Sequence, residues 1–198
     1  MKRAFDILAA AALLLPAAPL LLVLAVLVRV SSPGPAFFGH QRLGRGGQPF
    51  RCWKLRTMVT DAETWLRNDP ELHAKHRENG FKLRRSDDPR VTRLGWLLRY
   101  THLDELPQLM NVLVGDMSLV GPRPIVREEL AWYGDDADLL LSVRPGIFGP
   151  WTAHGRAREN YPERVNIELE YVREHSLASD LWTLARNVPV LIRGQVEE

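Results

Sequence analysis

A chain of 198 residues, 45% hydrophobic and 25% charged, has room for one domain and an apolar anchor but not for two full cores. Its net charge of +2 is unremarkable, and no nucleic-acid-binding motif accompanies the basic residues at 42–56 and 84–99. We expect those clusters to meet an anionic membrane or an anionic substrate, and no nucleic acid. The single cysteine, Cys52, excludes a disulfide framework and is expected to be a packing residue.

The N-terminal segment is apolar from Ile7 to Val28. A straight helix of about 22 residues is about 33 Å long, enough to cross the hydrocarbon core of a bilayer. A cleaved signal peptide is not expected, because the apolar stretch is long and no small-residue cleavage site follows it. Arg29 and a turn-forming run at residues 31–35 follow instead.

Two features argue against a simple spanning helix. Pro16 and Pro19 lie at mid-depth, where each removes a backbone donor and bends a helix. Basic residues also flank both ends of the segment, whereas the positive-inside rule asks for them on one side only. They are Lys2 and Arg3 before the segment, and Arg29, Arg42 and Arg45 after it. From these residues, a spanning helix and a re-entrant helix that returns to the same side both remain open.

Residues 37–57 predict a β-hairpin, because two arms with strand-like composition flank a glycine-rich turn at 44–47. Lys54 and Arg56 share one face of the second arm. They are either a solvated strand edge or cations that face a site.

Helices are expected over much of the remaining chain. A polar helix is predicted over residues 60–80, and a short one starts at Asp88-Pro89 and runs through Leu98. Two further helices, at 161–175 and 177–193, close the chain. The last is amphipathic and either lies on a bilayer or packs on the core. Together with the hairpin, these elements predict a mainly helical α+β fold.

Asp104 and Glu105 are adjacent carboxylates at the start of another amphipathic helix. Pro107 is tolerated only in a first turn, which places the helix start near Leu103 or Asp104. The carboxylates would then lie at a positive helix end, which favours their ionised form and phosphate binding. Such a pair can bind a divalent metal ion or divide nucleophilic and acid/base roles. The alternative is that Asp104 is only an N-cap.

The residues that follow Asp104 and Glu105 predict a buried helix face and a phosphate-binding arginine. The buried stripe of the helix is expected to have i, i+3, i+4, i+7 spacing. Its members would be Leu106, Leu109, Met110 and Leu113. Beyond the helix, Arg123 is held between two prolines and offers phosphate a fixed, planar guanidinium.

Over nearly its full length the chain resembles the bacterial sugar transferases, which are monotopic polyprenol-phosphate phosphoglycosyl transferases. The matching blocks lie at residues 2–6, 38–44, 54–58, 88–92, 103–109, 111–113, 115–124, 143–146 and 155–156. The resemblance implies transfer of a sugar-1-phosphate from a UDP-sugar to undecaprenyl phosphate, with release of UMP. That reaction begins the assembly of an exopolysaccharide, an O-antigen or another glycoconjugate.

The resemblance also implies an arrangement in the membrane. Residues 1–30 would form a re-entrant helix broken at Pro16 and Pro19, and residues 31–198 a catalytic domain with interfacial helices. This domain would lie on the cytoplasmic face of the bacterial inner membrane. Partners would be the UDP-sugar, undecaprenyl phosphate and the phospholipid bilayer, with a homodimer left open.

Roles for individual residues follow from the same resemblance. Asp104 would be the nucleophile that forms a covalent phosphosugar intermediate, and Glu105 would help to bind Mg²⁺ or assist proton transfer. Both carboxylates would be ligands of the Mg²⁺ ion. Cations at family positions would grip the phosphates: Arg99, Arg123, Arg144 and Arg156, with Lys54 as a further candidate.

The chain departs from the family pattern in three places. Ala18-Pro19 stands where a Ser-Pro pair is frequent, His102 replaces a frequent serine, and residues 148–153 differ from the usual loop. The sugar is therefore not fixed by the sequence, with a hexose preferred over an N-acetylated sugar. A Mg²⁺-dependent phosphohydrolase is one rival, since it would need no lipid acceptor. A non-catalytic membrane scaffold is another, although a scaffold has no need for Asp104 and Glu105.

Overall fold

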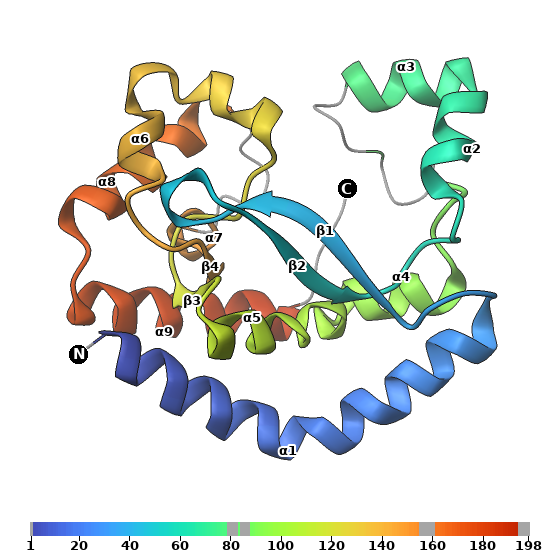
Figure 1. Ribbon diagram of the computed structural model, residues 1–198, viewed down its shortest axis with the longest axis horizontal. Helices are drawn as coiled ribbons and strands as arrows, with labels where there is room; N and C mark the ends of the chain where they lie inside the picture. Colours follow the sequence, from blue (N-terminus) through green and yellow to red (C-terminus); the bar gives the residue numbers. More distant parts are fainter. Residues whose placement is uncertain (1, 79–82, 84–87, 155–160, 194–198) are drawn as a thin grey trace.

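The computed structural model describes residues 2–78, 83, 88–154 and 161–193. Helix α1 (Lys2–Ser31) forms a bow beneath the rest of the chain (Figure 1). Above it lie α9 (Leu177–Arg193), α5 (Gln108–Val114) and α4 (Arg93–Tyr100), which follow one another in a row from left to right in Figure 1. The strands and the remaining helices lie above this row, so the mainly helical α+β fold predicted from the sequence is confirmed.

The first end of α1 is fastened to the body of the protein. Lys2 Nζ lies 2.5 Å from Asp180 Oδ2 at the start of α9. The buried carboxylate of Asp6 accepts hydrogen bonds from Ser118 Oγ at 2.9 Å and from Leu119 N–H at 3.1 Å. Charge-assisted hydrogen bonds are about twice as strong as neutral ones. Separating the N-terminal end of α1 from the rest of the protein therefore costs free energy.

The second end of α1 is fastened by one arginine of the hairpin. The Arg56 side chain is buried and donates to the carbonyls of Ser32 at 2.9 Å and Pro35 at 2.6 Å, and to Ser32 Oγ at 2.7 Å. It also reaches the carbonyl of Val28, in the last turn of the helix. Arg56 therefore has a structural role, and both ends of α1 are held by the same body.

We expect Arg56→Ala to lower the melting temperature by at least about 6 °C. It leaves several carbonyls without a donor, each at a cost of about 1–3 kcal/mol, and one kcal/mol corresponds to about 2–4 °C in a chain of this size. Thermal unfolding in detergent micelles, followed by circular dichroism, measures the change. Arg51→Ala is the matched control, because the Arg51 side chain is exposed on the same strand. Equal melting temperatures for the two variants would contradict the anchoring role.

The predicted hairpin is confirmed. Strands β1 (Phe37–Leu43) and β2 (Pro49–Leu55) pair antiparallel, and the short 3-10 helix η1 (Arg45–Gly47) joins them. Gly46 and Gly47 adopt positive φ values of 67° and 72°, which glycine reaches without strain. The glycine-rich turn was thus a reliable signal.

A second, parallel pair was not predicted. Strand β3 (Ser118–Val120) lies beside β4 (Gly146–Phe148). Strands of three residues are too short to show the alternation that reveals a strand in a sequence. The two segments approach closely where Gly146 meets Gly121, since a Cβ on Gly146 would lie 2.0 Å from the Gly121 nitrogen.

The single helix predicted over residues 60–80 is wrong within its described part. The structure has two helices there, α2 (Ala62–Asn68) and α3 (Pro70–Glu78). Pro70 lacks the N–H that would continue α2, but it fits the first position of a new helix. The two helices form an arm at the upper right of Figure 1.

The helix predicted to start at Asp88-Pro89 begins later, at Arg93. Thr92 is its N-cap, and Thr92 Oγ1 accepts the Gly95 N–H at 2.9 Å. Asp88 instead forms a buried ion pair with Arg90, with 2.7 Å between Arg90 Nε and Asp88 Oδ1. The local side-chain bonds of Asp88 compete with helix formation there.

The closing helices α8 (Glu163–Glu174) and α9 are confirmed. Short helices fill the region between the two parallel strands and just beyond it. They are η4 (Arg127–Trp132), η5 (Gly134–Asp136), α6 (Ala137–Leu140) and α7 (Pro150–Ala153).

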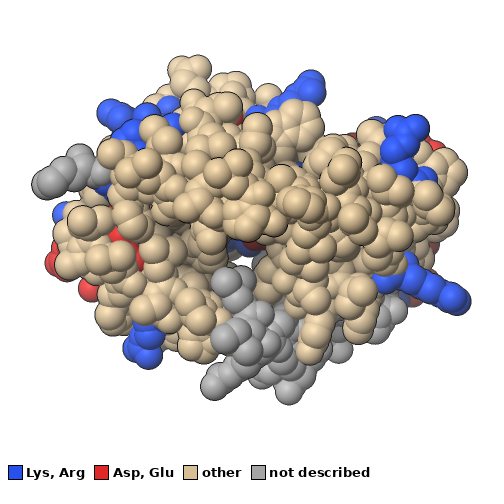
Figure 2. Space-filling view, turned by 90° about the horizontal axis from the view of Figure 1, so that it is seen from below, with Lys and Arg blue, Asp and Glu red and all other residues tan. Residues whose placement is uncertain are grey.

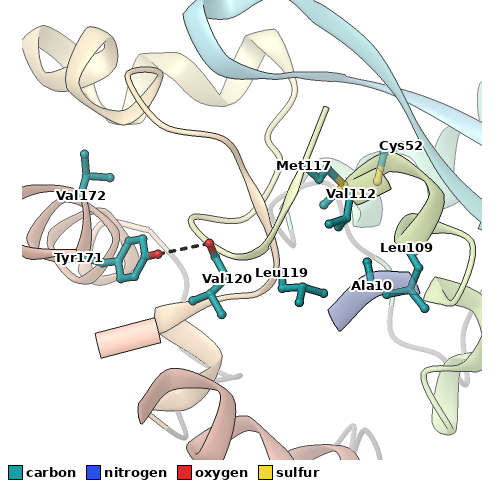
Figure 3. Packing of buried hydrophobic residues seen from close by; sticks show 9 residues of the cluster. All are labelled: Ala10, Cys52, Leu109, Val112, Met117, Leu119, Val120, Tyr171 and Val172. Atoms are coloured by element: carbon teal, nitrogen blue, oxygen red, sulfur yellow. Dashed lines mark hydrogen bonds between the residues drawn. The ribbon is translucent and has the colours of Figure 1, made fainter. Parts of the chain in front are cut away.

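The largest core cluster joins α1, β2, α5, β3 and α8 (Figure 3). Its members are Ala10, Cys52, Leu109, Val112, Met117, Leu119, Val120, Tyr171 and Val172. Cys52 is a buried packing residue, as predicted. The predicted stripe of α5 is partly wrong, because Met110 is 46% exposed and Val112 is fully buried. Leu106 precedes the helix, so a helical spacing that starts at Leu106 does not give the buried face of α5.

Exposed apolar side chains cover the underside of the protein. Helix α1 is long and apolar enough to cross a membrane. Seen from below, most of this face carries no charge, and lysines and arginines lie towards its edges (Figure 2). The row of helices above α1 adds further exposed apolar groups: Trp96 and Leu97 of α4, Met110 and Val114 of α5, and Leu181 and Trp182 of α9.

Candidate active site

The two adjacent carboxylates lie in a 3-10 turn, η3 (Leu103–Glu105), and not in an α-helix. Helix α5 begins only at Gln108, so its predicted start near Leu103 or Asp104 is wrong. The 3-10 turn forms because the Leu106 N–H donates to the Leu103 carbonyl. Pro107, which has no N–H, follows the turn as the N-cap of α5.

Asp104 is a buried carboxyl group with a raised pKa. Asp104 is 6% exposed. This burial and the charge of Glu105 raise its pKa to about 6, although the charges of Lys54 and Arg99 act to lower it. The prediction that a helix end favours its ionised form is therefore wrong for Asp104, because the residue lies in η3 ahead of α5 and its burial raises the pKa. Asp104 changes its protonation state close to neutral pH.

Glu105 differs from its neighbour because it has a cation of its own. Lys54 of β2 places its Nζ 2.5 Å from Glu105 Oε1. Burial acts to raise the Glu105 pKa, but Lys54 outweighs it and brings the pKa to about 2. Lys54 thus faces the carboxylates and is not a solvated strand edge. One carboxylate is firmly ionised beside another that can still be protonated.

Two of the predicted arginines lie near the pair. Arg99 lies in the last turn of α4, its Nε donates to Thr57 Oγ1 at 2.9 Å, and its charge acts to lower the pKa of Asp104. The side chain of Arg123 is exposed, and its charge acts to lower the pKa of Glu105. Together with Lys54, they surround the two carboxylates with positive charge.

Arg144 lies elsewhere. Its Nε donates to the Gly115 carbonyl at 2.7 Å, at the opposite end of α5 from Asp104. It lines an open pocket at the hairpin turn together with Arg45 and Ser142. Arg156 lies outside the described residues.

His102 occupies an unusual position beside the carboxylates. It adopts a left-handed conformation with φ 56°, which a residue other than glycine rarely does. Burial lowers the pKa of its ring, so the imidazole is neutral at neutral pH. Its Nε2 is buried and has no hydrogen-bond partner among the residues that the structure describes. This conformation and this nitrogen are both consistent with a functional position.

The sequence prediction missed a partly buried ionic network that links Arg42, Glu129, Arg164 and Glu168. Arg42 of β1 lies 3.3 Å from Glu129, and Arg164 Nε lies 2.9 Å from Glu168 Oε1 in α8. One signal was available: Arg164 and Glu168 occupy the buried stripe of α8, beside Val165 and Leu169. Charged residues on an apolar stripe indicate a paired, buried role.

The pair can contribute to a metal site but cannot complete one. Among the described residues, no group of three or more His, Cys, Asp or Glu side chains is placed to hold a metal ion. Asp104 and Glu105 nevertheless offer the oxygen ligands that Mg²⁺ prefers, and Mg²⁺ is commonly held by one or two carboxylates, substrate phosphates and water. The residues present therefore fit an ion that is bound together with a phosphorylated substrate.

Comparison with known proteins gives consistent matches. Residues 1–194 match the family described as bacterial sugar transferase. The chain is 45% identical to the undecaprenyl-phosphate galactose phosphotransferase of Salmonella typhimurium, over 98% of the chain and 40% of that protein. It is 42% identical to the exopolysaccharide production protein ExoY of Rhizobium meliloti, over 96% of the chain and 84% of ExoY. It is 40% identical to the UDP-glucose:undecaprenyl-phosphate glucose-1-phosphate transferase of Caulobacter vibrioides, over 96% of the chain and 69% of that protein.

Proposed function

Because this chain belongs to the bacterial sugar transferase family, we propose that it transfers a sugar-1-phosphate from a UDP-sugar to undecaprenyl phosphate and releases UMP. The match over residues 1–194 confirms the family that the sequence analysis predicted. The substrates are supported by the names of the Salmonella and Caulobacter relatives. ExoY supports a place in exopolysaccharide production. The sugar we propose is a hexose, since the Salmonella and Caulobacter relatives are named for galactose and glucose.

The observation that carries the proposal is a buried carboxylate beside an ionised one, with three cations around them. In the first step, an Asp104 oxygen attacks the β-phosphorus of the UDP-sugar. The bond from this phosphorus to the bridging oxygen breaks, and UMP leaves with that oxygen. In the second step, a phosphate oxygen of the lipid attacks the same phosphorus, the bond to Asp104 breaks, and the carboxylate is restored.

The surrounding residues prepare this chemistry. Lys54 keeps Glu105 ionised, while Arg99 and Arg123 offset the negative charge of the pyrophosphate that Asp104 must approach. We propose Asp104 and Glu105 as the protein ligands of a Mg²⁺ ion. When bound, this ion would neutralise phosphate charge.

We further propose that α1 is re-entrant and that the active site faces the cytoplasm at the inner membrane. Family membership and the apolar α1 indicate a membrane-associated protein. Support for the re-entrant arrangement comes from Lys2 and Arg56, which fasten the two ends of α1 to one body. The exposed apolar groups of α4, α5 and α9 fit an interfacial layer above it.

The test is UMP release from UDP-galactose, UDP-glucose and their N-acetylated counterparts, with and without undecaprenyl phosphate and Mg²⁺. We expect multiple turnovers only with the lipid acceptor, preferentially with a hexose. Free sugar phosphate produced without lipid would indicate a phosphohydrolase instead. No reaction with any of these sugars would contradict the proposed function.

The pKa of Asp104 predicts the pH dependence of transfer. Only the ionised carboxylate attacks phosphorus, so kcat/KM should fall about tenfold per pH unit below about pH 6 and level off above about pH 7. Lys54→Met removes a charge that acts to lower this pKa, so its inflection should move to higher pH. Steady-state rates of UMP release between about pH 5 and pH 8 measure both profiles. A wild-type profile that is flat over this range would contradict the assignment.

A further inference from the structure

Glu168 of α8 is a fully buried carboxylate at some distance in sequence from the site. Its side chain is 0% exposed. Its Oε1 accepts hydrogen bonds from the backbone N–H of Arg123 at 3.2 Å and from Arg164 Nε at 2.9 Å. The hydroxyl of Tyr133 donates to Oε2. Burying a charge is costly unless it is paired and hydrogen-bonded, and here all three donors converge on one carboxylate.

The Arg123 N–H is the only backbone donor of residues 122–124, because Pro122 and Pro124 have no N–H. Pro124 also restricts Arg123 to an extended conformation. On the other side, the Gly146 N–H donates to the Pro122 carbonyl at 2.8 Å. The bond to Glu168 therefore fixes the backbone of Arg123, whose side chain is exposed and whose charge acts on Glu105.

The partners of Glu168 are themselves held in place. The Arg164 guanidinium carbon lies 5.0 Å from the Tyr161 ring centre and 5.7 Å from that of Trp151. These are distances at which a cation is attracted to an aromatic face. Neither Tyr133 nor Arg164 has a part in the proposed chemistry. Tyr133 holds the carboxylate, and Arg164 also lies 3.8 Å from Glu129.

We propose that Glu168 is a positioning residue: by binding the backbone N–H of Arg123, it aims the Arg123 guanidinium at the phosphates of the nucleotide substrate. The inference rests on the proposed function, which supplies those phosphates. If Glu168 only stabilised the fold, its replacement would act equally whether or not Arg123 kept its side chain. If it acts through Arg123, its effect must disappear when that side chain is removed.

A double-mutant cycle separates the two cases. Glu168→Gln is expected to lower kcat/KM for the UDP-sugar about tenfold in the wild-type background, but less than about twofold in an Arg123→Ala background. The dissociation constant of UDP should follow the same pattern. Equal effects in the two backgrounds would overturn the inference. If the wild type binds UDP without transferring sugar phosphate, the proposed function fails, and the UDP cycle still decides the role of Glu168. A wild type that does not bind UDP would overturn both.

Tyr133→Phe is the matched control, because it removes another donor from the same carboxylate and leaves the Arg123 contact in place. We expect a lower melting temperature but kcat/KM within about twofold of wild type. If Tyr133→Phe lowered kcat/KM as much as Glu168→Gln, the effect would come from stability and the inference would fail. Should Glu168→Gln not fold, Glu168→Asp carries the same cycle, because it keeps the charge but withdraws the carboxylate by one methylene from the Arg123 N–H. Its effect on kcat/KM must then vanish in the Arg123→Ala background.

Discussion

Asp104→Asn is expected to abolish transfer, with a loss of at least about a thousandfold in kcat, while the protein stays folded. The amide has the same shape as the carboxylate but is a poor nucleophile. Its burial should not oppose the change, because a neutral group replaces one whose ionised form is disfavoured by burial. UMP release and the melting temperature in detergent micelles are measured on the same preparation.

A trapping experiment tests the nucleophilic role directly. With a UDP-sugar labelled in the sugar and no lipid acceptor, wild type should retain label on the protein, whereas Asp104→Asn should retain none. Asp138→Asn is the control, since this carboxylate is exposed on α6, and it should behave as wild type. Turnover at the wild-type rate by Asp104→Asn would remove Asp104 from the nucleophilic role. A wild type that retains no label would favour direct transfer between the two substrates.

The parts of the fold that the sequence predicted well depend on local patterns. The hairpin follows from a glycine-rich turn between two strand-like arms, and α9 from an amphipathic repeat over residues 177–193. The pairing of β3 with β4 depends on contacts between residues 118–120 and 146–148. Three residues carry no periodicity, so only the assembled structure reveals that pairing.

The residues of the candidate site could be predicted from local sequence, whereas their electrostatic properties depend on contacts between distant parts of the chain. Asp104 and Glu105 could be identified from their residue types and the proline that follows. Their opposite pKa shifts could not, because these depend on burial of Asp104 and on Lys54, which lies on a strand some fifty residues earlier. Glu168 was missed for a related reason. Its place on the apolar stripe of α8 indicates a buried pair, but its contact with Arg123 runs through a backbone N–H, which leaves no trace in the identity of either side chain.

Both ends of α1 are expected to lie on the same side of the membrane. A straight helix of this length extends about 45 Å, and its two ends could not both reach one body. Pro16 and Pro19 lie where the bend is needed, and each removes a backbone hydrogen bond there. In the protein that keeps both prolines, cysteines introduced singly at the exposed positions Ala4 and Arg45 should therefore be labelled by an impermeant reagent from the same side. The native Cys52 is buried and should stay unlabelled.

Replacing Pro16 and Pro19 together with leucine should straighten α1 and favour a spanning helix, because the restored hydrogen bonds remove the reason to bend. Ala4→Cys should then become accessible from the side opposite to Arg45→Cys in a substantial fraction of molecules. Ala17→Leu with Ala18→Leu is the matched control, since it adds apolar surface at neighbouring positions and keeps both prolines. It should leave both cysteines on one side. If the two cysteines of the otherwise wild-type protein were labelled from opposite sides, α1 would span the membrane and the re-entrant arrangement would be wrong.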